Sequence, residues 1–72
     1  MSKDDLDEWT LIYSTRQIHK IEIIKALLKE NEILAVSINK KDSAHAHLGE
    51  IELYVHARDE IFSKLIIEQN NL

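Results

Sequence analysis

A polar, turn-prone segment from Asn39 to Glu50 separates two runs of strand-forming residues, and it constrains the fold more than any other feature. The segment holds Gly49, the single glycine of a chain that contains no proline. The flanking runs, residues 33–38 and 50–56, are rich in residue types that favour strands. The segment therefore predicts a loop between two neighbouring strands.

The run at 50–56 has the clearest period-two alternation in the chain. Because side chains alternate between the two faces of a strand, Ile51, Leu53 and Val55 are predicted to face a core. A shift of one residue would bury a glutamate and a histidine instead, so this register is strongly specified.

The run at 33–38 also alternates, with Leu34, Val36 and Ile38 pointing one way. We expect the uncovered face of the sheet to carry the other set together with the polar side of 50–56: Ala35, Ser37, Asn39, Glu52, Tyr54 and His56. A third strand is predicted at residues 9–13. The pattern does not determine which of its side chains face the core, because Ile12 competes for the core with its neighbours Trp9, Leu11 and Tyr13.

Two helices complete the pattern. Residues 14–17 read Ser-Thr-Arg-Gln, which fits a capping box at the start of a helix that ends near Asn31. Its apolar stripe is Ile18, Ile21, Ile24 and Leu28, widened by Ile23 and Leu27. A second helix over about 57–69 is expected to bury Ile61, Phe62, Leu65 and Ile66, with Ile67 off that face.

These elements predict an α+β, ferredoxin-like fold in the order β-α-β-β-α. We expect a three-stranded antiparallel sheet in the order 1-3-2 with both helices on one face. Residues 1–7 are predicted to be a flexible acidic tail, and residues 8–72 a single domain.

Composition narrows the class of protein. The 72 residues contain no cysteine, which excludes disulfides and thiolate zinc sites. Nine basic against thirteen acidic residues give a net charge of −4, which argues against nucleic-acid binding. No apolar run approaches the roughly 20 residues of a membrane span, and no signal peptide is expected, so we predict a cytoplasmic location.

Small size favours association with a second copy. A domain this short has a thin core, and oligomerisation commonly adds stability to such folds. The edge of the first strand and the broad apolar arc of the first helix are the candidate surfaces. We therefore predict a homodimer, and an unknown protein partner for the module.

Four segments resemble a small family of prokaryotic signal transducing proteins: residues 9–13, 22–28, 39–43 and 48–55. The resemblance implies a ferredoxin-like fold related in shape to the PII nitrogen regulators, and a regulatory role. The chain departs from the family pattern at Glu32, where such sequences usually carry glycine, and at His56, where they usually carry proline.

Within the predicted loop, Lys40 and Lys41 followed by Asp42 and Ser43 could bind a phosphate or carboxylate. The alternative is structural, because Asp and Ser side chains shape turns and Gly49 supplies a conformation closed to other residues. We keep these five positions as candidate ligand-binding residues.

His45 and His47, with His56 from the next strand, form the only clustered set of candidate metal ligands. A closed zinc site needs four ligands, so we expect no tightly bound metal and no cofactor. Ser43 near these histidines has only local spacing, whereas catalytic triads assemble from separated elements. The sequence thus favours a small interaction or regulatory module that is not an enzyme. The alternative is a sensor that binds a small anion or metal through the 39–50 loop.

Overall fold

The computed structural model describes residues 8–39 and 50–72. The predicted tail at 1–7 and most of the predicted loop therefore lie outside the described residues. In chain order the elements are β1 (Trp9–Thr15), α2 (Ile18–Glu30), β2 (Ala35–Asn39), β3 (Ile51–His56), the short 3₁₀ turn η2 (Ala57–Asp59) and α3 (Glu60–Gln69).

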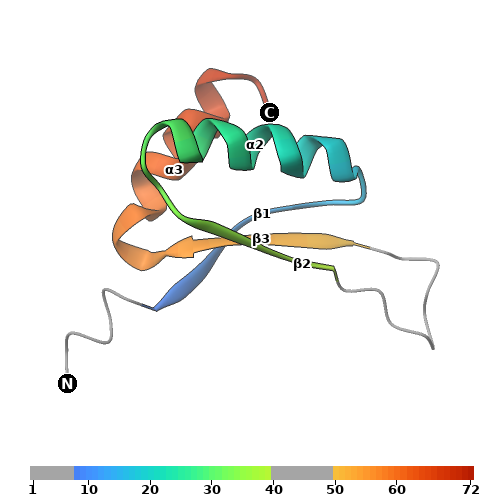
Figure 1. Ribbon diagram of the computed structural model, residues 1–72, viewed down its shortest axis with the longest axis horizontal. Coiled ribbons are helices and arrows are strands. Elements are labelled where there is room, and N and C mark those ends of the chain that lie inside the picture. Colours follow the sequence, from blue (N-terminus) through green and yellow to red (C-terminus); the bar gives the residue numbers. More distant parts are fainter. Residues whose placement is uncertain (1–7, 40–49) are drawn as a thin grey trace.

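The three strands form one antiparallel sheet in the order β1-β3-β2. Both helices lie on the same side of this sheet (Figure 1). The predicted α+β, ferredoxin-like arrangement is confirmed. Within the described ranges, neither helix has the length and apolar character needed to cross a membrane.

The core lies between the central strand β3 and the two helices. Leu53 and Val55 are fully buried and Ile51 is nearly so, as the alternation predicted. The remaining buried apolar side chains are Ile21, Ile24 and Leu28 of α2, Ile33 after it, and Ile66 and Ile67 of α3. In α2, Ile21, Ile24 and Leu28 are buried as predicted and Leu27 is half-buried, but Ile18, at the first helical position, and Ile23 are exposed.

A β-bulge in β1 resolves which of its residues face the core. Leu11 pairs with Tyr54, but Tyr13 pairs with Leu53, so Ile12 is an extra residue in β1. Before the bulge the odd-numbered residues share the outer face, and after it they share the core face. Ile12 and Tyr13 therefore both pack against the core, and the Tyr13 hydroxyl donates a 2.9 Å hydrogen bond to the Leu72 carbonyl.

The start of α2 also differs from the prediction. β1 continues through Thr15, so Ser14 lies in the strand and cannot cap the helix. The N-cap residue is Gln17, which makes no capping hydrogen bond with its side chain. The predicted capping box is therefore wrong.

The predicted orientation of β2 is also wrong. Val36 lies opposite Tyr54 and Ile38 opposite Glu52, so both point to the uncovered face. Ala35 and Ser37 lie on the core side, opposite buried residues of β3. The reason is that β2 contacts α2, and small side chains fit beneath a closely packed helix.

In α3 the buried side is Ser63, Ile66 and Ile67. Of the residues predicted to be buried, only Ile66 is, and Ile61 is 84% exposed. Phe62 and Leu65 are also exposed. The prediction failed because one of the buried positions is occupied by the small polar residue Ser63. The neighbouring stripe of the helix is more apolar, so the pattern predicted that stripe to be buried instead.

Both helices end in a Schellman motif, in which two amides bond back to the last helical turn. After α2, the amide of Ile33 donates to the Leu28 carbonyl and that of Glu32 to the Lys29 carbonyl, each at 2.9 Å. After α3, the amides of Leu72 and Asn71 donate to Ile67 and Glu68 in the same pattern. The C-cap residues match too, because Asn31 and Asn70 each bond through the side-chain amide to the carbonyl four residues back.

The motif places Glu32 in the left-handed conformation, with φ of 62°. The helix stops at Asn31 as predicted, but the reversal of the chain depends on Glu32. A residue with a Cβ atom adopts this conformation at a cost of roughly 1–2 kcal/mol, whereas glycine does so freely.

We therefore predict that Glu32→Gly raises the free energy of unfolding by about 1 kcal/mol, because relief of backbone strain exceeds the added entropy of the unfolded chain. The matched control is Glu22→Gly, which places the same substitution at an exposed position inside α2 and should lower stability by about 1 kcal/mol. Urea denaturation measures both. Equal destabilisation by the two variants would contradict the left-handed exit.

The orientation of α3 gives a second prediction. Ile67→Ala should lower the free energy of unfolding by about 2–5 kcal/mol, because it leaves a cavity in the core. Ile61→Ala makes the same substitution on the exposed side of the helix and should change stability by no more than about 0.5 kcal/mol. Thermal and urea melts compare the two, and a larger loss for Ile61→Ala would reverse the assigned faces.

Candidate functional site

The five candidate ligand-binding residues from the sequence, Lys40, Lys41, Asp42, Ser43 and Gly49, all lie outside the described residues. The same holds for His45 and His47. His56 is described, and it lies on the uncovered side of the sheet at the end of β3. Among residues 8–39 and 50–72, no three histidine or acidic side chains gather in a way that could hold a metal ion.

The described surface has one distinctive feature, the side of the sheet that faces away from α2 and α3 (Figure 1). We call it the open face. Its side chains are Trp9, Leu11 and Ser14 of β1, Val36 and Ile38 of β2, and Glu52, Tyr54 and His56 of β3. The four apolar side chains from the outer strands are between 38% and 46% exposed, so large apolar groups meet solvent here.

Pairing across the sheet sets these side chains in rows. Leu11, Tyr54 and Val36 are direct neighbours across the three strands and form the central row. Directly opposed residues of antiparallel strands lie about 4.5–5.5 Å apart, so this row is continuous. The bulge positions Leu11 here, because it reverses the faces of β1 only beyond this residue.

At one end of the open face, the rings of Trp9 and His56 stack with centroids 4.1 Å apart and planes inclined by 26°. The two residues are paired across β1 and β3, so backbone register and ring stacking reinforce each other. The stack fixes a broad, flat aromatic surface at this end of the sheet.

Towards the other end, the Tyr54 hydroxyl donates a 2.7 Å hydrogen bond to Glu52. This bond raises the pKa of Tyr54 above its ordinary value of 10.0, with further contributions from burial and from the negative charge of the carboxylate. Deprotonation would break the bond and place two negative charges together. The pair therefore holds the ring of Tyr54 in place at the centre of the face.

A hollow of about 450 Å³ lies on the open face, lined by Trp9, Val36, Ile38 and Tyr54. All four side chains present mainly carbon atoms. A hollow of this size and character is suited to a large apolar side chain of a binding partner.

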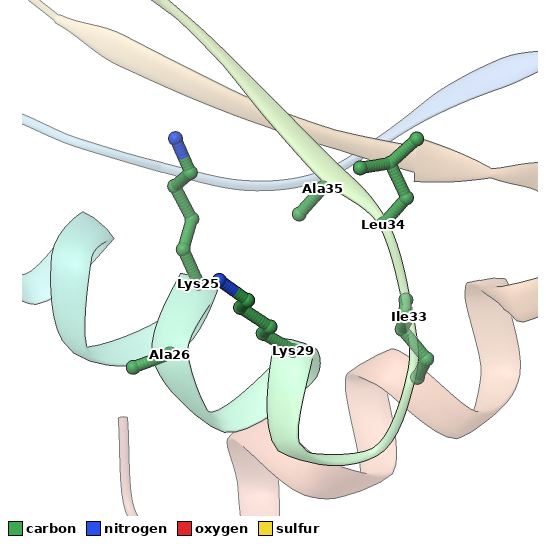
Figure 2. A pocket seen from close by; sticks show the side chains of 6 residues that line it. All are labelled: Lys25, Ala26, Lys29, Ile33, Leu34 and Ala35. Carbon is green, nitrogen blue, oxygen red and sulfur yellow. The ribbon is translucent and has the colours of Figure 1, made fainter.

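A second hollow, of about 310 Å³, lies between α2 and the start of β2. Figure 2 shows its lining residues, with Lys25 extending from α2 towards the sheet. They are Lys25, Ala26, Lys29, Ile33, Leu34 and Ala35. The two ammonium groups suggest an anion, but the hollow lies beside the C-terminal half of α2, where the carbonyl end of the helix dipole opposes negative charge. The aliphatic stems of Lys25 and Lys29 line the hollow beside Ile33 and Ala35.

Comparison of the chain with models of protein families, with curated proteins and with solved structures finds no match.

The sequence did not predict this apolar face. The alternation in the sequence predicted correctly that Glu52, Tyr54 and His56 lie on the uncovered side. It predicted wrongly that Val36 and Ile38 lie on the core side. The available signal was the small size of Ala35 and Ser37, which suits a strand lying directly beneath a helix.

The Tyr54–Glu52 pair gives a prediction. Glu52→Gln should lower the pKa of Tyr54 towards 10.0, because the charged acceptor is lost. NMR titration of the Tyr54 ring measures the shift. Glu60→Gln is the matched control, since Glu60 pairs with Lys64 on α3 and should leave the titration unchanged.

The same pair fixes the direction of a pH effect on stability. Because folding raises the pKa of Tyr54, the pair stabilises the fold fully below pH 10.0 and loses this effect as pH rises through the raised pKa. An unchanged Tyr54 titration in Glu52→Gln would contradict both statements.

Proposed function

We propose that this chain is a small, non-catalytic interaction module that acts in regulation by binding protein through the open face of its sheet. The observation that carries the proposal is the row of apolar side chains across an uncovered sheet, with a hollow beside it. An antiparallel sheet with one solvated side normally places polar residues there. Contiguous exposed apolar surface instead marks a site of interaction.

The chemistry of the face favours a protein partner over nucleic acid. Trp9, Tyr54 and His56 offer rings on which bases could stack, but single-stranded nucleic acid also needs a basic groove for its phosphates. The open face carries Glu52 and has neither lysine nor arginine among its defining residues. The net charge of −4 also disfavours nucleic acid, because it repels the phosphate backbone.

The proposal of a module without catalysis rests on the lining of the hollow. Tyr54 is the one ionisable residue of this lining, and a phenol is protonated near neutral pH because even its ordinary pKa is 10.0. A protonated phenol among aliphatic groups serves shape recognition better than proton transfer. The regulatory role draws support from the resemblance to prokaryotic signal transducing proteins, and the absence of cysteine suits a cytoplasmic location.

The alternative, a sensor for a small anion or metal, depends on residues 40–49, which lie outside the described residues. It stays a hypothesis from the sequence. Titration with phosphate or zinc, followed by amide NMR, tests it separately from the open face.

Selection of binding peptides tests the proposed function. A displayed peptide library should yield ligands with large apolar anchors that bind the chain. Val36→Thr with Ile38→Thr keeps both residues β-branched, so it preserves the strand while making the face polar. This double variant should bind the selected peptides about tenfold or more weakly, a loss of roughly 1.4 kcal/mol.

Ile61→Thr provides the control, since it makes a similar change on exposed α3 and should leave peptide binding intact. Amide NMR spectra confirm that each variant is folded. A selection that yields no ligand, or ligands indifferent to the double variant, would remove the open face as the working surface.

A further inference from the structure

We infer that the occupant of the open face is the open face of a second copy, so that two sheets pack face to face around a two-fold axis. This inference rests on the proposed function, because it assumes that the open face is a binding surface. It specifies the partner and its orientation. The charge pattern and the area of the face carry the argument.

Charge is distributed unevenly along β3. Glu52 lies at one end of the open face, with Glu50 two residues before it and exposed. His56 and its stacked partner Trp9 lie at the other end. The apolar row of Leu11, Tyr54 and Val36 lies between these ends. The face is thus apolar at its centre and acidic at one end only.

This pattern selects one of two possible orientations. With a two-fold axis along the strands, the Glu52 side chains of the two copies would face each other, and like charges would repel. With the axis across the strands, the acidic end of each copy lies over the Trp9–His56 end of its partner. The second orientation separates the carboxylates of the two copies, so it avoids the repulsion between like charges. The apolar rows then meet at the axis.

The area of the face determines the strength of the contact. Three strands spaced about 4.8 Å apart and about six residues long give a face of roughly 14 Å by 20 Å. This is smaller than the approximately 800 Å² that each partner buries in a stable complex. We therefore expect a transient dimer, with a dissociation constant between about ten micromolar and one millimolar.

Sedimentation equilibrium of the full chain, from about ten micromolar to a few millimolar, measures this association. Val36→Asp places a charge in the central row and should weaken dimerisation at least tenfold, because the dimer would bury an unpaired carboxylate from each copy. Ile61→Asp adds the same charge to the exposed side of α3 and should leave the dimer unchanged. Amide NMR confirms folding of both variants.

The orientation has its own test. His56→Lys places an ammonium group opposite the partner's Glu52 if the axis lies across the strands, so association should tighten a few-fold at low salt and lose this gain at high salt. With the axis along the strands, the two new lysines would face each other and association would weaken. The ammonium group can also lie over the Trp9 ring, which preserves part of the stacking contact.

A monomer at millimolar concentration would overturn this inference. So would a dimer that tolerates Val36→Asp, which would place the contact elsewhere, on α3 or at the outer edge of β1. Weakened association of His56→Lys would overturn the orientation. The proposed function fails on a different result, the absence of selected peptides that require Val36 and Ile38, so the two failures are distinguishable.

Discussion

The burial of every second side chain of β3 is the constraint on which the rest of this structure depends. β3 is the central strand, so both neighbouring strands take their register from it, and both helices cover its apolar side. Leu53 and Val55 are completely buried, and moving the strand by one residue would replace them with Tyr54 and His56. The same alternation that builds the core therefore also determines what the opposite face of the sheet presents.

Where the residue pattern allows only one face of an element to be buried, the sequence predicted that face correctly. Where the pattern allows either face to be buried, the prediction was wrong. In β3, polar and apolar residues alternate without exception, so both faces were assigned correctly. In β2 both sets of side chains contain groups that can be buried, and the choice falls to packing against α2, which no local pattern encodes. In α3 the buried Ser63 made the wrong stripe look more apolar. Its hydroxyl has no hydrogen-bond partner within the described part of the chain, which supports packing as the reason for its position.

The candidate site was missed for the same reason. Lys40, Lys41 and the neighbouring histidines bring side chains of distinctive chemistry together in one segment, which is visible in a sequence. The open face is made of ordinary core-type residues, and only their position on the uncovered side makes them informative. That position depends on two features without a strong sequence signal, the extra residue at Ile12 and the reversed faces of β2.

The bulge at Ile12 also changes what the outer edge of β1 offers to another strand. Among the described residues β1 is an edge strand, and an edge of unpaired backbone groups is a template on which further chains can grow into fibrils. A bulge interrupts the regular hydrogen-bonding pattern and increases the local twist, so a flat incoming strand cannot match the edge along its whole length. The residue that brings Leu11 and Tyr13 to opposite sides of β1 thus also makes this edge a poorer template for a further strand than the regular edge of β2.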